Sequence, residues 1–135
     1  AEQLVLGTGA VESGYRWLHQ VGTGPAIGLF QMEPATYRDH WNNFLAFKPD
    51  LRVAVLSLAS RAAGDPPPPE EMGWNLRFAA AMCRVHYYRA PGALPKAMDV
   101  GGMAALWKTR YNSMLGAGTP DDFVRAWQKH VSAVL

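Results

Sequence analysis

The chain has 135 residues, of which 49% are hydrophobic and 18% charged. This length fits one domain spanning residues 1–135, and the apolar content excludes an intrinsically disordered chain. The net charge of +2 comes from 13 Lys and Arg against 11 Asp and Glu without a dense basic block, so we expect no nucleic-acid partner.

Several other classes of protein are excluded by what the sequence lacks. No run approaches the roughly 20 apolar residues that a membrane span needs, and no basic region followed by an apolar stretch opens the chain. We therefore expect no membrane insertion and see no signal peptide. The single Cys83 cannot form an internal disulfide, and the four histidines are far apart. We expect no metal, no cofactor and a monomer.

The first expected helix covers about residues 2–15, where one face carries Leu4, Thr8, Val11 and Tyr15 at helical spacing. Glu12 lies at the margin of this face. Gly7 and Gly9 each lower helix propensity by about 1 kcal/mol relative to Ala, which predicts close packing against another segment. We expect this helix to be central.

The next segments alternate between breaks and helices. Residues 17–27 contain Gly22-Thr23-Gly24-Pro25 and predict an irregular loop or a small hairpin beside a cleft. Pro34 is placed to begin a second helix, with Tyr37, Trp41, Phe44 and Leu45 on its apolar face. A third helix is expected over residues 51–63, followed by a stiff extended connector at Pro66–Pro69.

The second half of the chain gives three more helices. The clearest spans residues 74–88 and carries the buried thiol of Cys83. Asp99 is expected to cap a helix that reaches about Tyr111, and Thr119 to cap a last helix. The last helix should bury Phe123, Ala126, Trp127 and Val131. The sequence therefore predicts a mainly helical fold with at most a minimal β-hairpin.

Two short motifs point to chemistry on sugars. They are Glu12-Ser13 and Gly28-Leu29-Phe30-Gln31 ahead of Pro34, with Gln31 nineteen positions after Glu12. A glycosidic bond breaks when a carboxylic acid protonates the departing oxygen, so one Glu of raised pKa carries the essential step. In these motifs the chain resembles the lytic transglycosylases and goose-type lysozymes of the lysozyme-like superfamily.

This resemblance implies a single lysozyme-like domain with a central catalytic helix. It implies that Glu12 is the general acid and later the base, that Ser13 and Gln31 hold the sugar, and that Phe30 and Tyr87 form cleft walls. A third family motif, Ala-Tyr-Asn-Ala-Gly, is loosely matched by residues 86–92, where Tyr88 replaces the substrate-binding Asn. The Tyr111-Asn112 region is similar to small phage-encoded relatives.

Each of these residues also has a purely structural interpretation. Glu12 can be a solvated helix carboxylate, and Gln31 can cap a helix or satisfy a buried carbonyl. Tyr87 can be a core aromatic with a bonded hydroxyl, and Ser13 a local backbone partner at a helix end. Glu33, before Pro34, suits a carboxylate that interacts with a helix dipole. The five tryptophans are expected mostly in the core, with one at a sugar subsite a further possibility.

No Asp or Glu occurs between Ser13 and Met32, so a second catalytic carboxylate must be Glu33, Asp39 or a distant residue. One Glu suffices if the sugar's own 6-hydroxyl attacks and gives a 1,6-anhydro product. We therefore expect a lytic transglycosylase that cleaves the β-1,4 bond between N-acetylmuramic acid and N-acetylglucosamine in peptidoglycan.

Three alternatives stay open. They are a hydrolytic muramidase such as an endolysin, a noncatalytic wall-binding or virion structural protein of the same fold, and a chitinase-like enzyme. If the protein is a lytic transglycosylase, we expect it to act on the bacterial cell wall, in the periplasm or outside the cell. Its resemblance to small phage-encoded relatives suggests a bacteriophage origin or a place in the virion.

Overall fold

The computed structural model describes residues 1–20, 23–113 and 115–135 and is mainly helical, as the sequence predicts. Its helices are α1 (Glu2–Ser13), α2 (Pro34–Asn43), η1 (Leu45–Phe47), α3 (Pro49–Leu56), α4 (Glu71–Trp74), α5 (Leu76–Arg89), α6 (Val100–Trp107), η2 (Lys108–Asn112) and α7 (Pro120–His130). In the described residues, β-structure is limited to isolated antiparallel bridges that pair Ile27 with His19 and with Met32. Gly22, expected in the loop there, lies outside the described residues.

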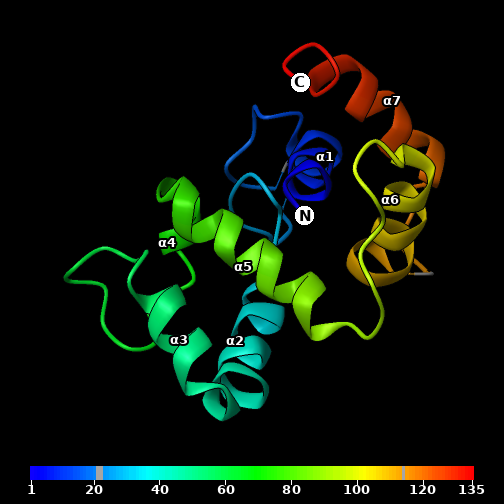
Figure 1. Ribbon diagram of the computed structural model, residues 1–135. Helices are drawn as coiled ribbons and strands as arrows, with labels where there is room; N and C mark the ends of the chain where they lie inside the picture. The colour runs from blue at the N-terminus through cyan, green and yellow to red at the C-terminus, as the bar shows by residue number, and fades with distance from the viewer. Residues whose placement is uncertain (21–22, 114) are drawn as a thin grey trace.

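Helix α5 crosses the middle of the molecule and separates two groups of helices (Figure 1). On one side α7 packs against both α1 and α6. On the other side lie α2, α3 and α4, each of which contacts α5. The two groups therefore share α5 as their common support.

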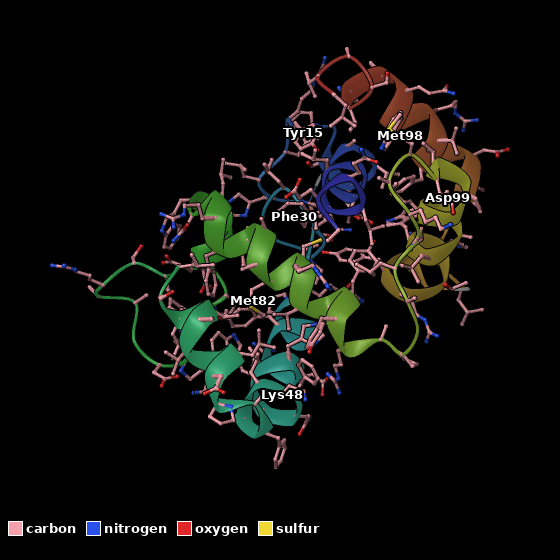
Figure 2. The ribbon with its side chains drawn as sticks, viewed as in Figure 1. Tyr15, Phe30, Lys48, Met82, Met98 and Asp99 are labelled. Atoms are coloured by element: carbon pink, nitrogen blue, oxygen red, sulfur yellow. The ribbon has the colours of Figure 1, made fainter. Side chains whose placement is uncertain are left out.

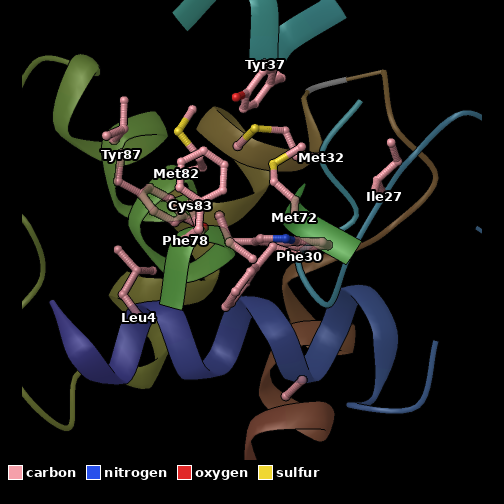
Figure 3. Close-up of a cluster of buried hydrophobic side chains, with 14 of the residues drawn as sticks. Leu4, Ile27, Phe30, Met32, Tyr37, Met72, Phe78, Met82, Cys83 and Tyr87 are labelled. Carbon is pink, nitrogen blue, oxygen red and sulfur yellow. The ribbon is translucent and has the colours of Figure 1, made fainter. Parts of the chain in front are cut away.

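The core forms where both groups meet α5 (Figure 3). Phe78, Met82 and Cys83 of α5 are inaccessible to solvent, and Leu4 of α1 is 2% exposed. The close packing predicted at the glycines of α1 is confirmed, because a Cβ on Gly7 would lie 2.3 Å from Cζ of Phe123. Helix α1 is thus held tightly against α7.

Both predicted helix starts are confirmed by side-chain caps. The carboxylate of Asp99 accepts a hydrogen bond from the Gly102 amide at 2.9 Å. Thr119 accepts one from the Asp122 amide at 3.2 Å, while the Asp122 carboxylate accepts one from the Thr119 amide at 2.7 Å. This reciprocal pair satisfies two backbone donors at the start of α7.

Three helix boundaries differ from the expectation. Helix α3 ends at Leu56 rather than residue 63, and the Ser60 amide donates to Glu71 at 2.8 Å instead of continuing a helix. Helix α5 begins at Leu76 rather than residue 74, because Asn75 caps it by accepting from the Phe78 amide at 3.1 Å. Helix α6 ends at Trp107, and the chain continues as a π-helical turn through Asn112.

The tryptophans divide between core and surface. Trp41, Trp107 and Trp127 are buried as expected, whereas Trp17 and Trp74 are 56% and 62% exposed. Within the described part of the chain, none of the helices has the length and apolar character required to cross a lipid bilayer.

Candidate active site

A cleft of about 680 Å³ opens between the two groups of helices. Its walls come from the end of α1, the segment before α2, the start of α2, the end of α5 and the η2 turn. It is lined by Glu12, Trp17, Gln20, Ala26, Gln31, Met32, Glu33, Thr36, His86, Tyr111, Asn112, Ser113 and Gly116. Aromatic rings and side-chain amides dominate this surface, which suits the apolar faces and hydroxyl groups of sugars.

Glu12 lies in the last turn of α1 and reaches the cleft from inside the protein. The indole N–H of Trp107 donates to its Oε1 at 2.8 Å. Burial raises the pKa of Glu12 from its usual 4.5 to about 7, although the Trp107 hydrogen bond opposes that rise. A carboxyl group with this pKa both gives and takes a proton near neutral pH, which is the property that acid–base catalysis requires.

Gln31 enters the cleft on a tight turn that begins at Gly28. Gly28 has a φ of 76°, and a Cβ there would lie 2.3 Å from the Met72 carbonyl oxygen, so only glycine fits. The amide of Gln31 donates to the Gly28 carbonyl at 2.9 Å, which holds the side chain against its own turn. The turn of the Gly-Leu-Phe-Gln motif thus places Gln31 in the wall of the cleft.

Phe30 belongs to this turn but points into the core, between α1 and α5 (Figure 2). Its side chain is 7% exposed and is not part of the cleft lining. Its carbonyl oxygen instead accepts a hydrogen bond from the Tyr111 hydroxyl at 2.8 Å. Phe30 therefore supports the wall from behind, whereas we expected its ring to be the wall.

Ser13 is buried behind Glu12 and does not line the cleft. Its hydroxyl donates to the Gly9 carbonyl at 3.1 Å and accepts from the Tyr15 amide at 3.2 Å. Gly14 follows with a φ of 56° and ends the helix. The structure places Ser13 as the local backbone partner considered above, where it fixes the end of the helix that carries Glu12.

Tyr87 and Tyr88 lie away from the cleft. Tyr87 is 2% exposed, and its hydroxyl donates at 2.7 Å to Thr8, whose own hydroxyl donates to the Leu4 carbonyl. Tyr88 is 55% exposed and packs against Phe44. Of residues 86–92, which loosely match the third motif, only His86 lines the cleft.

The Tyr-Asn pair that does reach the cleft is Tyr111-Asn112. The ring of Tyr111 packs against that of Tyr87 at 5.5 Å between centroids, so Tyr111 covers the position at which we expected Tyr87 to face the sugar. The sequence does contain an indication that this pair reaches the cleft, because Tyr111-Asn112 matches the Tyr-Asn of the third family motif. Trp107 had no such indication, since its link to Glu12 joins residues 95 positions apart.

Among the described residues that line the cleft, Glu33 is the only carboxylate besides Glu12, and no Lys or Arg is present. Glu33 is exposed and occupies the N-cap position of α2, where its side chain makes no capping hydrogen bond. Asp39 lies outside the cleft and forms an ion pair with Arg89. A second carboxylate for hydrolysis would therefore have to be Glu33.

No group of three or more His, Cys, Asp or Glu residues in the described ranges is arranged to hold a metal ion. Cys83 is fully buried, and burial raises the pKa of its thiol well above the usual range, so it is not a reactive thiolate.

Comparisons of the chain with protein-family models, with curated proteins and with solved structures gave no match. The resemblance to lysozyme-like enzymes therefore rests on the sequence motifs around Glu12 and Gln31 alone, and both residues line the cleft.

Proposed function

We propose that this protein is a peptidoglycan lytic transglycosylase that cleaves the β-1,4 bond between N-acetylmuramic acid and N-acetylglucosamine. The observation that carries the proposal is Glu12, a mostly buried carboxyl group with a pKa of about 7 that lines a cleft of about 680 Å³. Its substrate would place the enzyme at the bacterial cell wall.

In the first step, protonated Glu12 donates its proton to the glycosidic oxygen while the bond from that oxygen to the anomeric carbon breaks. The N-acetyl group of the sugar assists at the anomeric carbon. The second oxygen of Glu12 is available for this work, because in the described residues the Trp107 bond engages Oε1 alone. Trp107 thus orients the carboxyl group without occupying its reactive edge.

In the second step, the Glu12 carboxylate takes the proton of the muramic acid 6-hydroxyl, whose oxygen bonds to the anomeric carbon as the bond from that carbon to the assisting N-acetyl oxygen breaks. The product is a 1,6-anhydro sugar, and Glu12 is protonated again for the next cycle. No water and no second carboxylate enter this sequence. It therefore agrees with a cleft that offers one buried acid, since the intramolecular attack gains its rate from proximity.

Hydrolysis by a muramidase is the second candidate, and the position of Glu33 on the cleft lining favours it. In an inverting hydrolase Glu33 would activate a water, and in a retaining one it would attack the anomeric carbon. Both roles need a second carboxyl group at the cleft, and among the described lining residues Glu33 is the one present besides Glu12. Replacement of Glu33 therefore separates the two reactions.

The deciding experiment incubates bacterial sacculi with the wild type, Glu12→Gln and Glu33→Gln, and identifies the released muropeptides by mass spectrometry. A transglycosylase gives anhydro products, lighter by one water than hydrolysed ones, that depend on Glu12 and survive Glu33→Gln. Reducing ends that require both residues identify a muramidase. No release by the wild type from several wall types identifies a noncatalytic wall-binding or virion protein. Cleavage of chitin oligomers at a comparable rate identifies the chitinase-like alternative.

A further inference from the structure

A second cavity of about 520 Å³ adjoins the cleft and takes no part in the proposed reaction on the glycan. Thr36 and His86 line both spaces, so the two lie next to each other. The second cavity, here called the side pocket, is lined by Ala35, Thr36, Asp39, His40, His86, Arg89, Ala90, Thr109 and Arg110. A polymer lying in the cleft can therefore extend a branch into the side pocket.

The two spaces differ in charge. In the described residues, the cleft lining carries two carboxylates and no Lys or Arg, whereas the side pocket has two guanidinium groups, those of Arg89 and Arg110. Asp39 offsets one of them through its ion pair with Arg89. The side pocket keeps one net positive charge beside an uncharged or acidic cleft.

Arg89 is held in a fixed orientation with part of its guanidinium unused. Its Nη1 donates to Asp39 and, at 3.3 Å, to Nδ1 of His40. In the described part of the chain, no protein acceptor contacts its Nε or Nη2. These free donors suit a carboxylate, which guanidinium groups bind through paired hydrogen bonds.

The two histidines of the side pocket form an ordered chain of hydrogen bonds. His86 donates from Nε2 to the carbonyl oxygen of Arg110 at 2.6 Å, so its Nδ1 accepts from Nε2 of His40 at 2.9 Å. Nδ1 of His40 is then free to accept from Arg89. This order requires both rings to be neutral, and burial lowers the pKa of both, that of His40 to about 4.

The histidine pair therefore adds no charge at neutral pH. It acts as a neutral support that connects the guanidinium of Arg89 to the backbone of Arg110, although the two residues come from different elements, α5 and η2. The side chain of Arg110 is exposed and takes no part in this chain, so it remains available to a ligand.

We propose that the side pocket binds a carboxylate of the peptide stem that muramic acid carries in peptidoglycan, with Arg89 and Arg110 as its ligands. The inference rests on the proposed function, because the glycan in the cleft defines where the stem emerges. Peptide stems branch from the same strand that the cleft would hold, so a site beside the cleft suits a stem, whereas a phosphate-rich wall polymer has no need of a site beside the cleft. The protein would thus select strands whose stems are intact.

Binding is tested with Glu12→Gln, which removes turnover, and two probes: a muramyl tetrapeptide with free carboxyl groups and the same molecule with its carboxyl groups amidated. We expect the free acid to bind at least about tenfold more tightly, because hydrogen bonds from a guanidinium to an ionised carboxylate are stronger than those to a neutral amide. Adding Arg110→Gln should remove most of this difference, since it deletes the exposed guanidinium and leaves the backbone bond to His86.

Arg77→Gln is the matched control, because Arg77 is an exposed arginine on α5 that lines neither space. It should leave the preference for the free acid unchanged, and Arg110→Lys should restore part of it. Equal binding of the two probes overturns the proposal, and so does an equal loss in the Arg77 and Arg110 variants. Glycerol phosphate that binds more tightly than the free acid also overturns it and points to a phosphate polymer.

The same proteins separate this inference from the proposed function. On sacculi, the Arg110→Gln enzyme should show a KM raised about tenfold with little change in kcat, and no change on glycan strands from which the stems have been removed. If the Arg110→Gln enzyme cleaves both substrates as well as the wild type does, the proposed function stands and the stem site in the side pocket is contradicted. If the protein prefers the free acid but the wild type cleaves neither substrate, the stem site in the side pocket stands and the proposed reaction is contradicted.

Discussion

Two buried glutamates show how one residue type takes opposite roles in this fold. Glu12 lies at the cleft, where burial raises its pKa to about 7 and Trp107 is its hydrogen-bond partner. Glu71 lies in α4, is 1% exposed, and has a pKa below its usual 4.5. Burial raises the pKa of Glu71 too, but hydrogen bonds from Asn75 and Ser60 outweigh it.

The two carboxyl groups differ in the number of hydrogen bonds that they accept. Glu71 accepts from the Ser60 amide at 2.8 Å, the Ser60 hydroxyl at 2.7 Å and the Asn75 side chain at 2.8 Å. These bonds stabilise its charged form and tie the segment after α3 to α4. Glu12 has one donor and so holds its proton to higher pH. Several donors therefore stabilise the ionised form of Glu71, whereas the single donor of Glu12 leaves its pKa raised.

Glu12→Gln should cause the largest loss of activity. Removal of a general acid lowers the rate by about a thousandfold, within the range of 10²–10⁴ typical for such groups. The measurement is the rate of muropeptide release, with circular dichroism to show that the fold is kept. Activity within a factor of ten of the wild type would contradict the role of Glu12.

The same variant should change how stability depends on pH. The pKa of Glu12 is raised from its usual 4.5 to about 7, so the folded state holds this proton more tightly than the unfolded chain does. Wild-type stability therefore falls as pH rises through this interval, by as much as about 3 kcal/mol relative to Glu12→Gln. Urea unfolding of both proteins at several pH values checks this, and parallel curves would contradict it.

Glu71→Gln should affect stability rather than chemistry. Loss of the charged acceptor from three buried hydrogen bonds costs about 1–3 kcal/mol at pH 7. Because the pKa of Glu71 is lowered, its contribution is present above the usual value of 4.5 and is lost as pH falls through its folded-state pKa. The deficit of the variant should therefore shrink in acid. A loss of kcat in the folded variant would show that the two sites are not separate.

Trp107→Phe should have the smallest effect on the rate, and it isolates the contribution of the Trp107 hydrogen bond to the pKa of Glu12. The Trp107 bond lowers the pKa of Glu12, so its removal should raise that pKa further. The loss of activity at high pH should then move to higher pH, with a change in rate of about tenfold or less. A pH–rate profile measures this shift. If the loss of activity moved to lower pH instead, the Trp107 hydrogen bond could not be lowering the pKa of Glu12.

The sequence predicts the helical architecture well because its indications are local. The spacing of apolar residues identifies most helices, and Asp99 and Thr119 cap helices where their sequence context places them. The ends of α3 and α5 are missed because Ser60 and Asn75 bond to partners that helical periodicity does not reveal. Local patterns cannot report these tertiary contacts.

The cleft is predicted less completely than the fold. Glu12, Gln31 and Glu33 line it as expected, since their motifs lie on one helix end and one turn. Tyr87 and Tyr111 have similar chemistry, and only the packing of η2 against α5 decides that Tyr111 faces the cleft. Trp107 is brought to Glu12 by the packing of α6 near α1, a contact that no spacing in the sequence indicates.

Near pH 7 we expect the carboxyl group of Glu12 to be about half protonated and that of Glu71 to be ionised. The direct test is a titration of both carboxyl carbons by ¹³C NMR, assigned with Glu12→Gln and Glu71→Gln. We predict that Glu12 titrates near pH 7 and Glu71 below its usual 4.5. A Glu12 that titrates at or below pH 4.5 would contradict its role as the general acid, because its carboxyl group would then be ionised when it has to donate a proton.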